Sequence, residues 1–320
     1  MAVVDGTREL MRHDLEVWPG DQGAGRSGEA GMTRRGLLAA AGLGAAALVA
    51  GGVAWRVAPW RDWLGAAGDA VGVDIPGTPH VIRRDFTLHS RYVGGPVPYS
   101  IAWPPGSEPG DPLPVCFALP GRGGGPPMGF ADFVAAAVRK DQSPPYAVVG
   151  VDGGQSYWHR RKTGEDRLSM LLRELVPLCA RTYRLGGGRG RAVIGWSMGG
   201  YGAVLAAETE PRLFAAVVAV GPAVWTSYDA MMLGPRDAFD DAADFAEHDV
   251  IARADRLEGV DLRIDCGRKD PFYCYVTSLA AALPDPGSVH YGSGGHDYDF
   301  FHKVAPADAR FIGRALRRRA

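Results

Sequence analysis

Three short motifs carry side chains that together can do nucleophilic chemistry. Ser197 lies in the motif GWSMGG, Asp270 in DCGRKD and His296 in SGGHD. A serine becomes a nucleophile when a histidine within hydrogen-bond reach takes its proton and a third group orients that histidine. The sequence therefore predicts attack on a carbonyl carbon by Ser197, with His296 as the base and Asp270 as the acid.

The placement of Ser197 carries more weight than the five-residue pattern GxSxG, which arises easily by chance in a chain with 45 glycines. The motif follows the apolar run AVIG and precedes a segment of small residues typical of a helix. A nucleophilic serine needs such a strand-to-helix turn, and flanking glycines leave the backbone room to make it. The start of the following helix also favours negative charge at the site.

Acyl transfer further needs hydrogen-bond donors for the developing oxyanion. We expect one to be the backbone N–H of Met198, and the second to come from the glycine-rich loop PGRGGG that follows an apolar strand. Within that loop we assign Arg122, with Gly123 as the fallback and as a substrate contact. The alternative is a plain flexible turn. The loop is no phosphate-binding motif, the cysteines are too scattered for a zinc site, and we predict no cofactor and no metal.

Other acids and histidines lie in settings that suit structural tasks. Asp265 falls inside a predicted strand, which favours a buried, hydrogen-bonded carboxylate, while Asp297 and Asp299 lie where the last helix begins and are expected to cap it. His290 lies in a strand and His302 in a helix, where packing or exposure is the default.

Alternating strands and helices are expected to position these residues. Two strands at 80–88 and 97–103 predict an antiparallel entry, and later apolar runs are nearly continuous, as in strands covered on both faces. The pattern predicts a mostly parallel central sheet with helices on both faces, which holds its working residues at the carboxyl ends of the strands. The later strands are expected at 113–119, 146–151, 192–196, 214–220, 260–266 and 288–291, and the helices at 128–139, 166–183, 200–208, 245–256, 273–283 and 300–318.

The three motifs together resemble those of the putative-esterase family of α/β-hydrolases, over roughly residues 80–318. That family includes esterase D, feruloyl-type esterases and exported mycolyltransferases, and the segment DGGQSYWH at 152–159 is similar to a loop of the last branch. The resemblance implies an α/β-hydrolase fold and a serine esterase. Acyl transfer to a sugar or lipid hydroxyl is the alternative, although Asp270 stands where mycolyltransferases have Glu. A non-catalytic envelope-binding module is a third possibility, which the complete triad order disfavours.

Two tryptophans are candidate substrate contacts. Trp158, with the three residues after it, predicts either a substrate rim or a solvated loop. Trp225 opens the segment 225–249, whose Met and aromatic residues predict either a lid holding an acyl or aryl group or an inserted element packed in the core.

The N-terminal quarter differs from the rest. Residues 1–31 are expected to be a disordered leader, or to precede a true start at Met32, and 32–56 resemble a twin-arginine export signal, with TRRGLL followed by an Ala- and Gly-rich run. A single membrane-spanning anchor is the alternative. A linker at 57–78 then leads to the catalytic domain at 79–320. The protein is thus expected outside the cytoplasmic membrane, secreted or anchored.

The numbers of charged residues and cysteines limit the kinds of partner and of covalent cross-link that the protein can have. The 320 residues carry 35 basic and 36 acidic side chains, a net charge of −1, with no basic stripe, which argues against a nucleic-acid partner and for a small-molecule, glycan or lipid ester. Four cysteines allow up to two disulfides. Only Cys266 and Cys274 are close in sequence, and buried free thiols are the alternative.

Overall fold

The computed structural model of the chain describes residues 81–188 and 190–319. The predicted leader, export segment and linker all lie outside the described residues, so those assignments stay predictions. Within the described ranges, no helix is both long and apolar enough to cross a bilayer.

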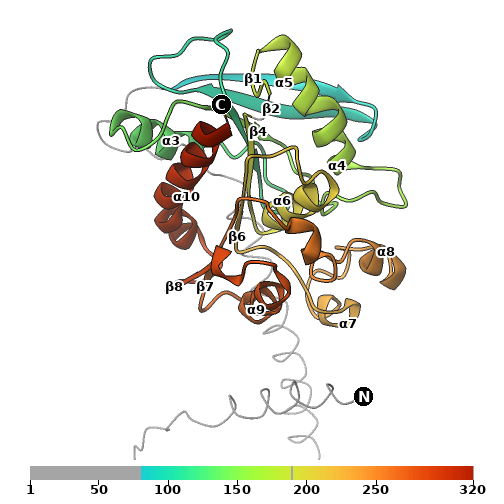
Figure 1. Ribbon diagram of the computed structural model, residues 1–320. Coiled ribbons are helices and arrows are strands. Elements are labelled where there is room, and N and C mark those ends of the chain that lie inside the picture. The colour runs from blue at the N-terminus through green and yellow to red at the C-terminus, as the bar shows by residue number, and fades with distance from the viewer. Residues whose placement is uncertain (1–80, 189, 320) are drawn as a thin grey trace, which may run out of the picture. The chain divides into compact units, whose positions relative to one another are not determined.

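Eight strands form one sheet in the order β1-β2-β4-β3-β5-β6-β7-β8 (Figure 1). β1 pairs with β2, and β2 with β4, in antiparallel fashion, and every other neighbouring pair is parallel. The antiparallel entry and the parallel remainder were both expected from the sequence, and both are confirmed. The strands are β1 (Ile82–Ser90), β2 (Gly95–Trp103), β3 (Val115–Leu119), β4 (Ala147–Val151), β5 (Arg191–Trp196), β6 (Ala216–Val220), β7 (Leu262–Gly267) and β8 (Val289–Gly292).

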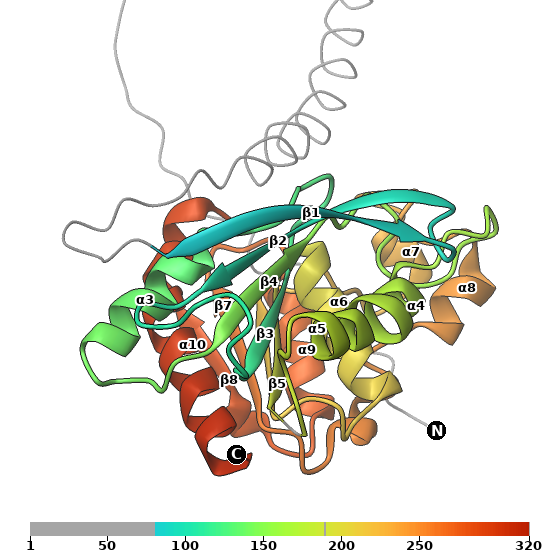
Figure 2. The same ribbon diagram turned by 90° about the horizontal axis from the view of Figure 1, so that it is seen from above.

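Helices cover both faces of the sheet, as Figures 1 and 2 show from two directions. One face carries α3 (Phe130–Arg139) and α10 (Tyr298–Arg319). The other carries α5 (Val176–Thr182), α6 (Met198–Thr209) and α9 (Tyr273–Ala282), with the short helices α7 (Tyr228–Met231) and α8 (Ala242–Glu247) beyond them.

The strand sequences explain this three-layer arrangement. Successive side chains of a strand point to opposite faces, so a strand buried on both faces must be apolar at every position. In β3, Val115, Phe117 and Leu119 lie in one hydrophobic cluster, and Cys116 and Ala118 lie in the other. The nearly continuous apolar runs therefore reflect two cores, one on each side of the sheet.

Two predicted helices differ from the structure. The segment expected at 166–183 is divided into α4 (Arg167–Ser169), a π-helical turn at Met170–Leu175 and α5. Pro177, near the start of α5, lacks the N–H that a regular α-helix requires, and the wider turn before it accommodates that loss.

The helix predicted at 245–256 was wrong in its bounds. α8 begins at Ala242 because the Asp241 side chain accepts the backbone N–H groups of Ala243 and Asp244, and it ends at Glu247. The chain then turns, with Asp249 accepting the amide of Ile251 at 2.9 Å, before 3-10 turns at Ala254–Leu257 and, further on, Pro286–Ser288. Local side-chain caps thus override the apolar spacing on which the prediction rested.

All four cysteines are free thiols. Cys116, Cys179 and Cys266 are buried in the two cores and Cys274 is exposed, so the alternative of buried free thiols describes three of them. A bridge between Cys266 and Cys274 is not present.

Candidate active site

The site lies where the connections from two neighbouring parallel strands diverge. β3 and β5 pair up to Leu119 and Gly195 at their carboxyl ends. The chain leaves β3 for α3 on one face of the sheet and leaves β5 for α6 on the other (Figure 2). Such a divergence opens a crevice beyond the sheet edge, where α/β proteins bind their ligands.

Ser197 stands at this crevice on the predicted strand-to-helix turn. Its backbone has φ 55° and ψ −117°, a conformation that residues with a side chain rarely adopt. Its N–H donates to the carbonyl of Val220 at 3.0 Å, and its carbonyl accepts the N–H of Ala223 at 3.0 Å, so β6 holds the turn. A side chain at Gly195 would overlap the Gly199 backbone, which explains the flanking glycine.

Asp270 and His296 meet although 26 residues separate them. His296 Nδ1 lies 2.8 Å from Asp270 Oδ2, and the two side chains are 8% and 0% exposed. The other carboxylate oxygen, Asp270 Oδ1, accepts the N–H of Phe272 at 2.8 Å, which fixes the plane of the carboxylate. The loops after β7 and β8 are joined by the N–H of Lys269, which donates to the Gly294 carbonyl at 3.0 Å.

Gly221, which sequence reasoning missed, brings these groups together. It directly follows β6, its φ is +50°, and a Cβ there would lie 2.8 Å from Asp270 Oδ2 and 3.1 Å from His296 Nδ1. Only a residue without a side chain leaves room for this pair beside the turn of Ser197. The signal in the sequence was the pair Gly221-Pro222, directly after a predicted strand.

Two backbone N–H groups are available at the crevice. Within the described residues, the amides of Arg122 and Met198 donate to no protein acceptor. The amide of Gly123 donates to the Gly154 carbonyl at 2.7 Å, so the fallback choice of Gly123 as oxyanion donor was wrong; its use as a substrate contact stays a prediction. The Arg122 side chain turns away into an ion pair with Asp237.

A second loop supports the loop that carries Arg122. The Gly153 N–H donates to the Gly124 carbonyl at 3.3 Å, and Arg167 Nη1 donates to the Asp152 carbonyl at 2.9 Å. A side chain at Gly154 would overlap the guanidinium of Arg167. Nothing in the sequence pattern marked Arg167 as this support, because it lies 15 residues from Asp152 and on another element.

The competing residues have the structural settings expected of them. Asp265 is buried against Arg263 Nη2 at 2.7 Å, and Arg263 Nε also contacts Asp308 of α10 at 2.8 Å. Burial raises the pKa of both aspartates. Asp297 Oδ1 accepts the N–H of Phe300 at 2.8 Å at the start of α10, and His302 packs edge-on against Phe133.

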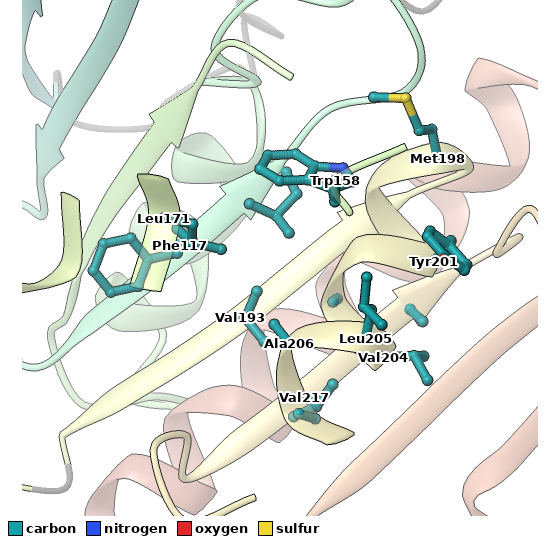
Figure 3. Packing of buried hydrophobic residues seen from close by; sticks show 14 of the residues in the cluster. Phe117, Trp158, Leu171, Val193, Met198, Tyr201, Val204, Leu205, Ala206 and Val217 are labelled. Atoms are coloured by element: carbon teal, nitrogen blue, oxygen red, sulfur yellow. The ribbon is translucent and has the colours of Figure 1, made fainter. Parts of the chain in front are cut away.

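Both tryptophans predicted as substrate contacts are part of the core. Trp158 is fully buried above α6, where a side chain at Gly202 would overlap its indole ring (Figure 3). A side chain with no accessible surface cannot form a substrate rim, so that prediction was wrong. Trp225 is 3% exposed and packs edge-on against Phe239 and Phe272, which makes it core packing as well.

A small apolar groove borders the crevice instead. Gly121 of the loop after β3 and Trp196, the residue before Ser197 in the sequence, both line it. Phe301, on the same groove, has its ring 5.6 Å from that of His296. The remaining wall comes from the start of α10 and from the region of α3, and consists of Pro120, Pro127, Gly129, Phe130, Phe133, Tyr298, His302 and Ala305.

Several solved structures share this architecture. A ferulic acid esterase matches with 20% identity and a TM-score of 0.65, covering 74% of this chain and 100% of its own. An S-formylglutathione hydrolase from Staphylococcus aureus matches with 19% identity and a TM-score of 0.56 over 74% of this chain and 100% of its own. A ferulic acid esterase from Anaeromyces mucronatus, in complex with ferulic acid, matches with 15% identity and a TM-score of 0.56 over 77% and 94%. At such identities these likenesses establish the α/β-hydrolase fold.

The sequence itself gives the family. A comparison with curated protein sequences gave no match. The family model described as "Putative esterase" matches residues 90–302, more than half of the chain and all of the loops that carry Ser197, Asp270 and His296. The chain therefore belongs to the putative-esterase family.

Proposed function

We propose that the protein hydrolyses carboxylic esters through an acyl-enzyme formed on Ser197. Ser197 Oγ attacks the ester carbonyl while His296 takes its proton, and His296 returns that proton to the departing alcohol. Water, activated by His296 in the same way, then releases the acid. The amides of Met198 and Arg122 hold the oxyanion in both steps.

The observation that carries the proposal is the pair of Asp270 and His296 seated on Gly221. Because a carboxylate only accepts hydrogen bonds, the 2.8 Å contact places a proton on His296 Nδ1. The neutral ring then presents an unprotonated Nε2, which is the atom that can accept the proton of Ser197. Asp270 also stabilises the imidazolium that forms, without itself being protonated.

The groove supports an ester with an apolar group on one side of the carbonyl. Its walls are aromatic and aliphatic, and it begins next to both Ser197 and the proposed oxyanion loop. Structural relatives named as ferulic acid esterases indicate that this fold can admit an aromatic acyl group. We propose that the apolar acyl or aryl part of the substrate occupies this groove.

The test is hydrolysis of p-nitrophenyl esters of graded acyl length, and of a methyl ferulate ester, by the purified full-length protein. We expect release of p-nitrophenol from at least one ester and its loss in Ser197→Ala. An acceptor sugar added to the same assay distinguishes hydrolysis from transfer, because transfer would yield an acylated sugar. Absence of all turnover in a folded protein would contradict the proposal and favour a binding module.

We also propose that the protein is exported by the twin-arginine route, on the strength of its sequence alone. Arg34 and Arg35 precede the Ala- and Gly-rich run, the arrangement such signals require. Replacing both arginines by lysine should retain the protein in the cytoplasm, as measured by immunoblots of cell fractions. Equal export of the variant and the parent protein would contradict this proposal.

A further inference from the structure

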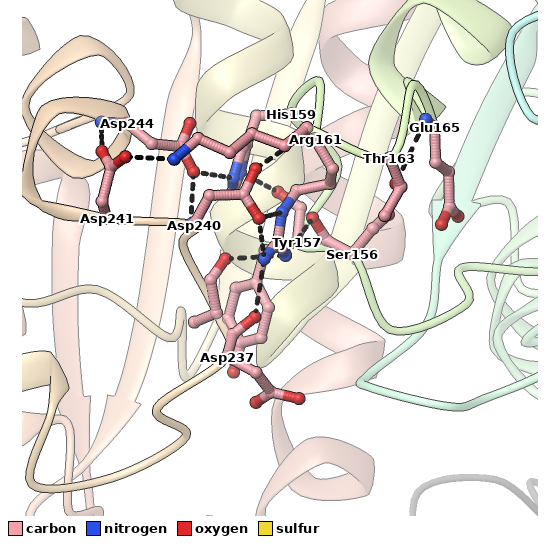
Figure 4. Close-up of polar contacts among 12 residues, drawn as sticks. Ser156, Tyr157, His159, Arg161, Thr163, Glu165, Asp237, Asp240, Asp241 and Asp244 are labelled. Carbon is pink, nitrogen blue, oxygen red and sulfur yellow. Dashed lines mark hydrogen bonds and ion pairs between the residues drawn. The ribbon is translucent and has the colours of Figure 1, made fainter.

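His159, from the loop after β4, meets Asp244 of α8 and His248 at the end of that helix. Within the described residues, His159, Asp244 and His248 each offer one ligand atom, and the three atoms lie within 4.8 Å of one another. His159 Nε2 is 3.1 Å from Asp244 Oδ2, and His248 Nδ1 is 3.0 Å from Asp244 Oδ1. The two imidazole rings stack with their centroids 4.6 Å apart. Figure 4 shows His159 directed at the Asp244 carboxylate.

Both ring nitrogens of His159 face oxygen atoms that accept hydrogen bonds. Its Nδ1 lies 3.0 Å from the Tyr157 carbonyl, which can only accept, so Nδ1 carries a hydrogen. A neutral ring would then turn the lone pair of Nε2 toward the Asp244 carboxylate, an arrangement of two acceptors. A cation must lie between Nε2 and the carboxylate. It is either a proton on the ring or a metal ion.

The side chains of His159 and Asp244 are each held by a second hydrogen bond, as ligands of a bound metal ordinarily are. The Tyr157 carbonyl orients His159, and the N–H of Asp240 donates to Asp244 Oδ2 at 2.7 Å. His248 Nδ1 also lies 2.9 Å from the main-chain carbonyl of Asp244, so this nitrogen carries a hydrogen that it must lose before it can bind a metal ion. The ring of His159 is further fixed by stacking on Phe239 at 4.8 Å.

We propose that these three residues form a site for a divalent transition-metal ion, with Zn²⁺ the best match. Two imidazoles and one carboxylate are zinc ligands, whereas Mg²⁺ and Ca²⁺ prefer oxygen donors only. With bonds of about 2.0–2.2 Å, two neighbouring donors on a tetrahedral zinc lie roughly 3.3 Å apart. The contact of 3.1 Å between His159 Nε2 and Asp244 is near that spacing, and His248 completes the site once its ring turns from the main-chain carbonyl of Asp244 toward the ion.

The surroundings give the ion a path in and a structural task. His159 is fully buried, but the side chains of Asp244 and His248 are 11% and 17% exposed, so the cluster opens to solvent on their side. The ion would join the loop after β4, which carries His159, to α8 and its C-terminal end. Three aromatic rings, each in contact with the next, separate His159 from His296: those of Phe239, Trp225 and Phe272. The ion would therefore not take part in ester chemistry.

The test uses tag-free full-length protein, stripped with a chelator and titrated with Zn²⁺ in a calorimeter, with Mg²⁺ as the control ion. We expect one Zn²⁺ per chain and a rise in melting temperature of about 5 °C at saturation. His248→Asn and Asp244→Asn should each weaken Zn²⁺ binding at least tenfold, because the loss of an outer-shell partner alone costs about 10–100-fold. His89→Asn, which removes an exposed histidine of β1, should leave binding unchanged.

A second measurement guards against variants that fail to fold. Co²⁺ bound to the parent protein should give the visible absorption of a tetrahedral nitrogen and oxygen site, and excess Zn²⁺ should abolish it. The proposal is overturned if the folded parent protein binds no Zn²⁺ stoichiometrically, in which case a proton on His159 is the cation. It is equally overturned if folded His248→Asn and Asp244→Asn variants bind Zn²⁺ as tightly as the parent.

Discussion

His296 Nδ1 lies 2.8 Å from Asp270 Oδ2, and both atoms lie against the bare Cα of Gly221. Three loops, after β6, β7 and β8, supply one residue each to this contact. The Ser197 turn is hydrogen-bonded to the residue before Gly221. The positions of base and acid therefore depend on a residue that carries no functional group.

Gly221→Ala should disable the enzyme. The new methyl group would lie 2.8 Å from Asp270 Oδ2 and must displace the Asp270–His296 pair. A displacement of about 1 Å costs roughly 100-fold in kcat. The matched control is Gly259→Ala, because Gly259 also has a positive φ but has nothing within 4 Å of its Cβ position. Steady-state hydrolysis should fall in the first variant only. Equal activity of the two variants would exclude the tight contact at Gly221.

Asp270→Asn should lower kcat by about 10³-fold or more. The N–H of Phe272 must still find an oxygen, so the single amide oxygen stays with it and the NH₂ group faces His296. Nδ1 would then have to accept, which moves the ring proton to Nε2, where it blocks the transfer from Ser197. Asp265→Asn, at a buried aspartate that faces Arg263, should leave kcat unchanged. A fall in Asp265→Asn comparable to that in Asp270→Asn would contradict the assignment of the acid.

Ser197→Gly should be inactive and yet more stable than the parent protein. The backbone at φ 55° and ψ −117° is accessible to glycine without strain, whereas other residues pay about 1–3 kcal/mol there. Ser197→Ala removes the hydroxyl but keeps the strain, and serves as the control. Urea unfolding followed by tryptophan fluorescence measures the difference, which we expect to be about 1–2 kcal/mol. Ser197→Gly being no more stable than Ser197→Ala would show that the turn is unstrained.

The stability of the fold should fall between about pH 5 and pH 8 through Glu208. Burial raises the pKa of Glu208 from its ordinary 4.5 to about 8. The guanidinium of Arg253, 3.1 Å away, lowers this pKa, but its effect is smaller than that of burial. Between these values the folded chain retains a proton that the unfolded chain has lost, so the free energy of unfolding declines by up to about 1.4 kcal/mol per pH unit. Glu208→Gln stays neutral and should lack this component.

Urea unfolding of the parent protein and of Glu208→Gln at several pH values measures the contribution of Glu208 to the free energy of unfolding. The free energy of unfolding of the parent, relative to that of Glu208→Gln, should decrease steadily from pH 5 to pH 8. Parallel stability curves for the two proteins would mean that Glu208 is ionised in the folded state throughout.

The parts of the fold that could be predicted are those encoded locally. The Ser197 turn follows from glycines and a strand within six residues, and the two-sided sheet follows from runs such as that of β3. Trp158 could not be placed in this way, because its burial depends on Gly202, a residue of another element that leaves space for the indole ring. The sequence therefore predicted either a substrate rim or a solvated loop for it.

Long-range pairings were equally hidden. Gly221 becomes important only once three loops meet, and the partner of His159 is Asp244, 85 residues away. His248 reaches Asp244 only because Asp241 starts α8 where it does, which leaves His248 at the end of that helix. Such contacts arise from tertiary packing, which residue spacing does not record.

The most direct test of the account is intact-mass analysis of the full-length protein after reaction with a fluorophosphonate. We predict one adduct per chain, mapped by peptide sequencing to Ser197, and no adduct in Ser197→Ala under the same conditions. An adduct on a different serine, or ester hydrolysis that survives in Ser197→Ala, would contradict the assignment of Ser197 as the nucleophile.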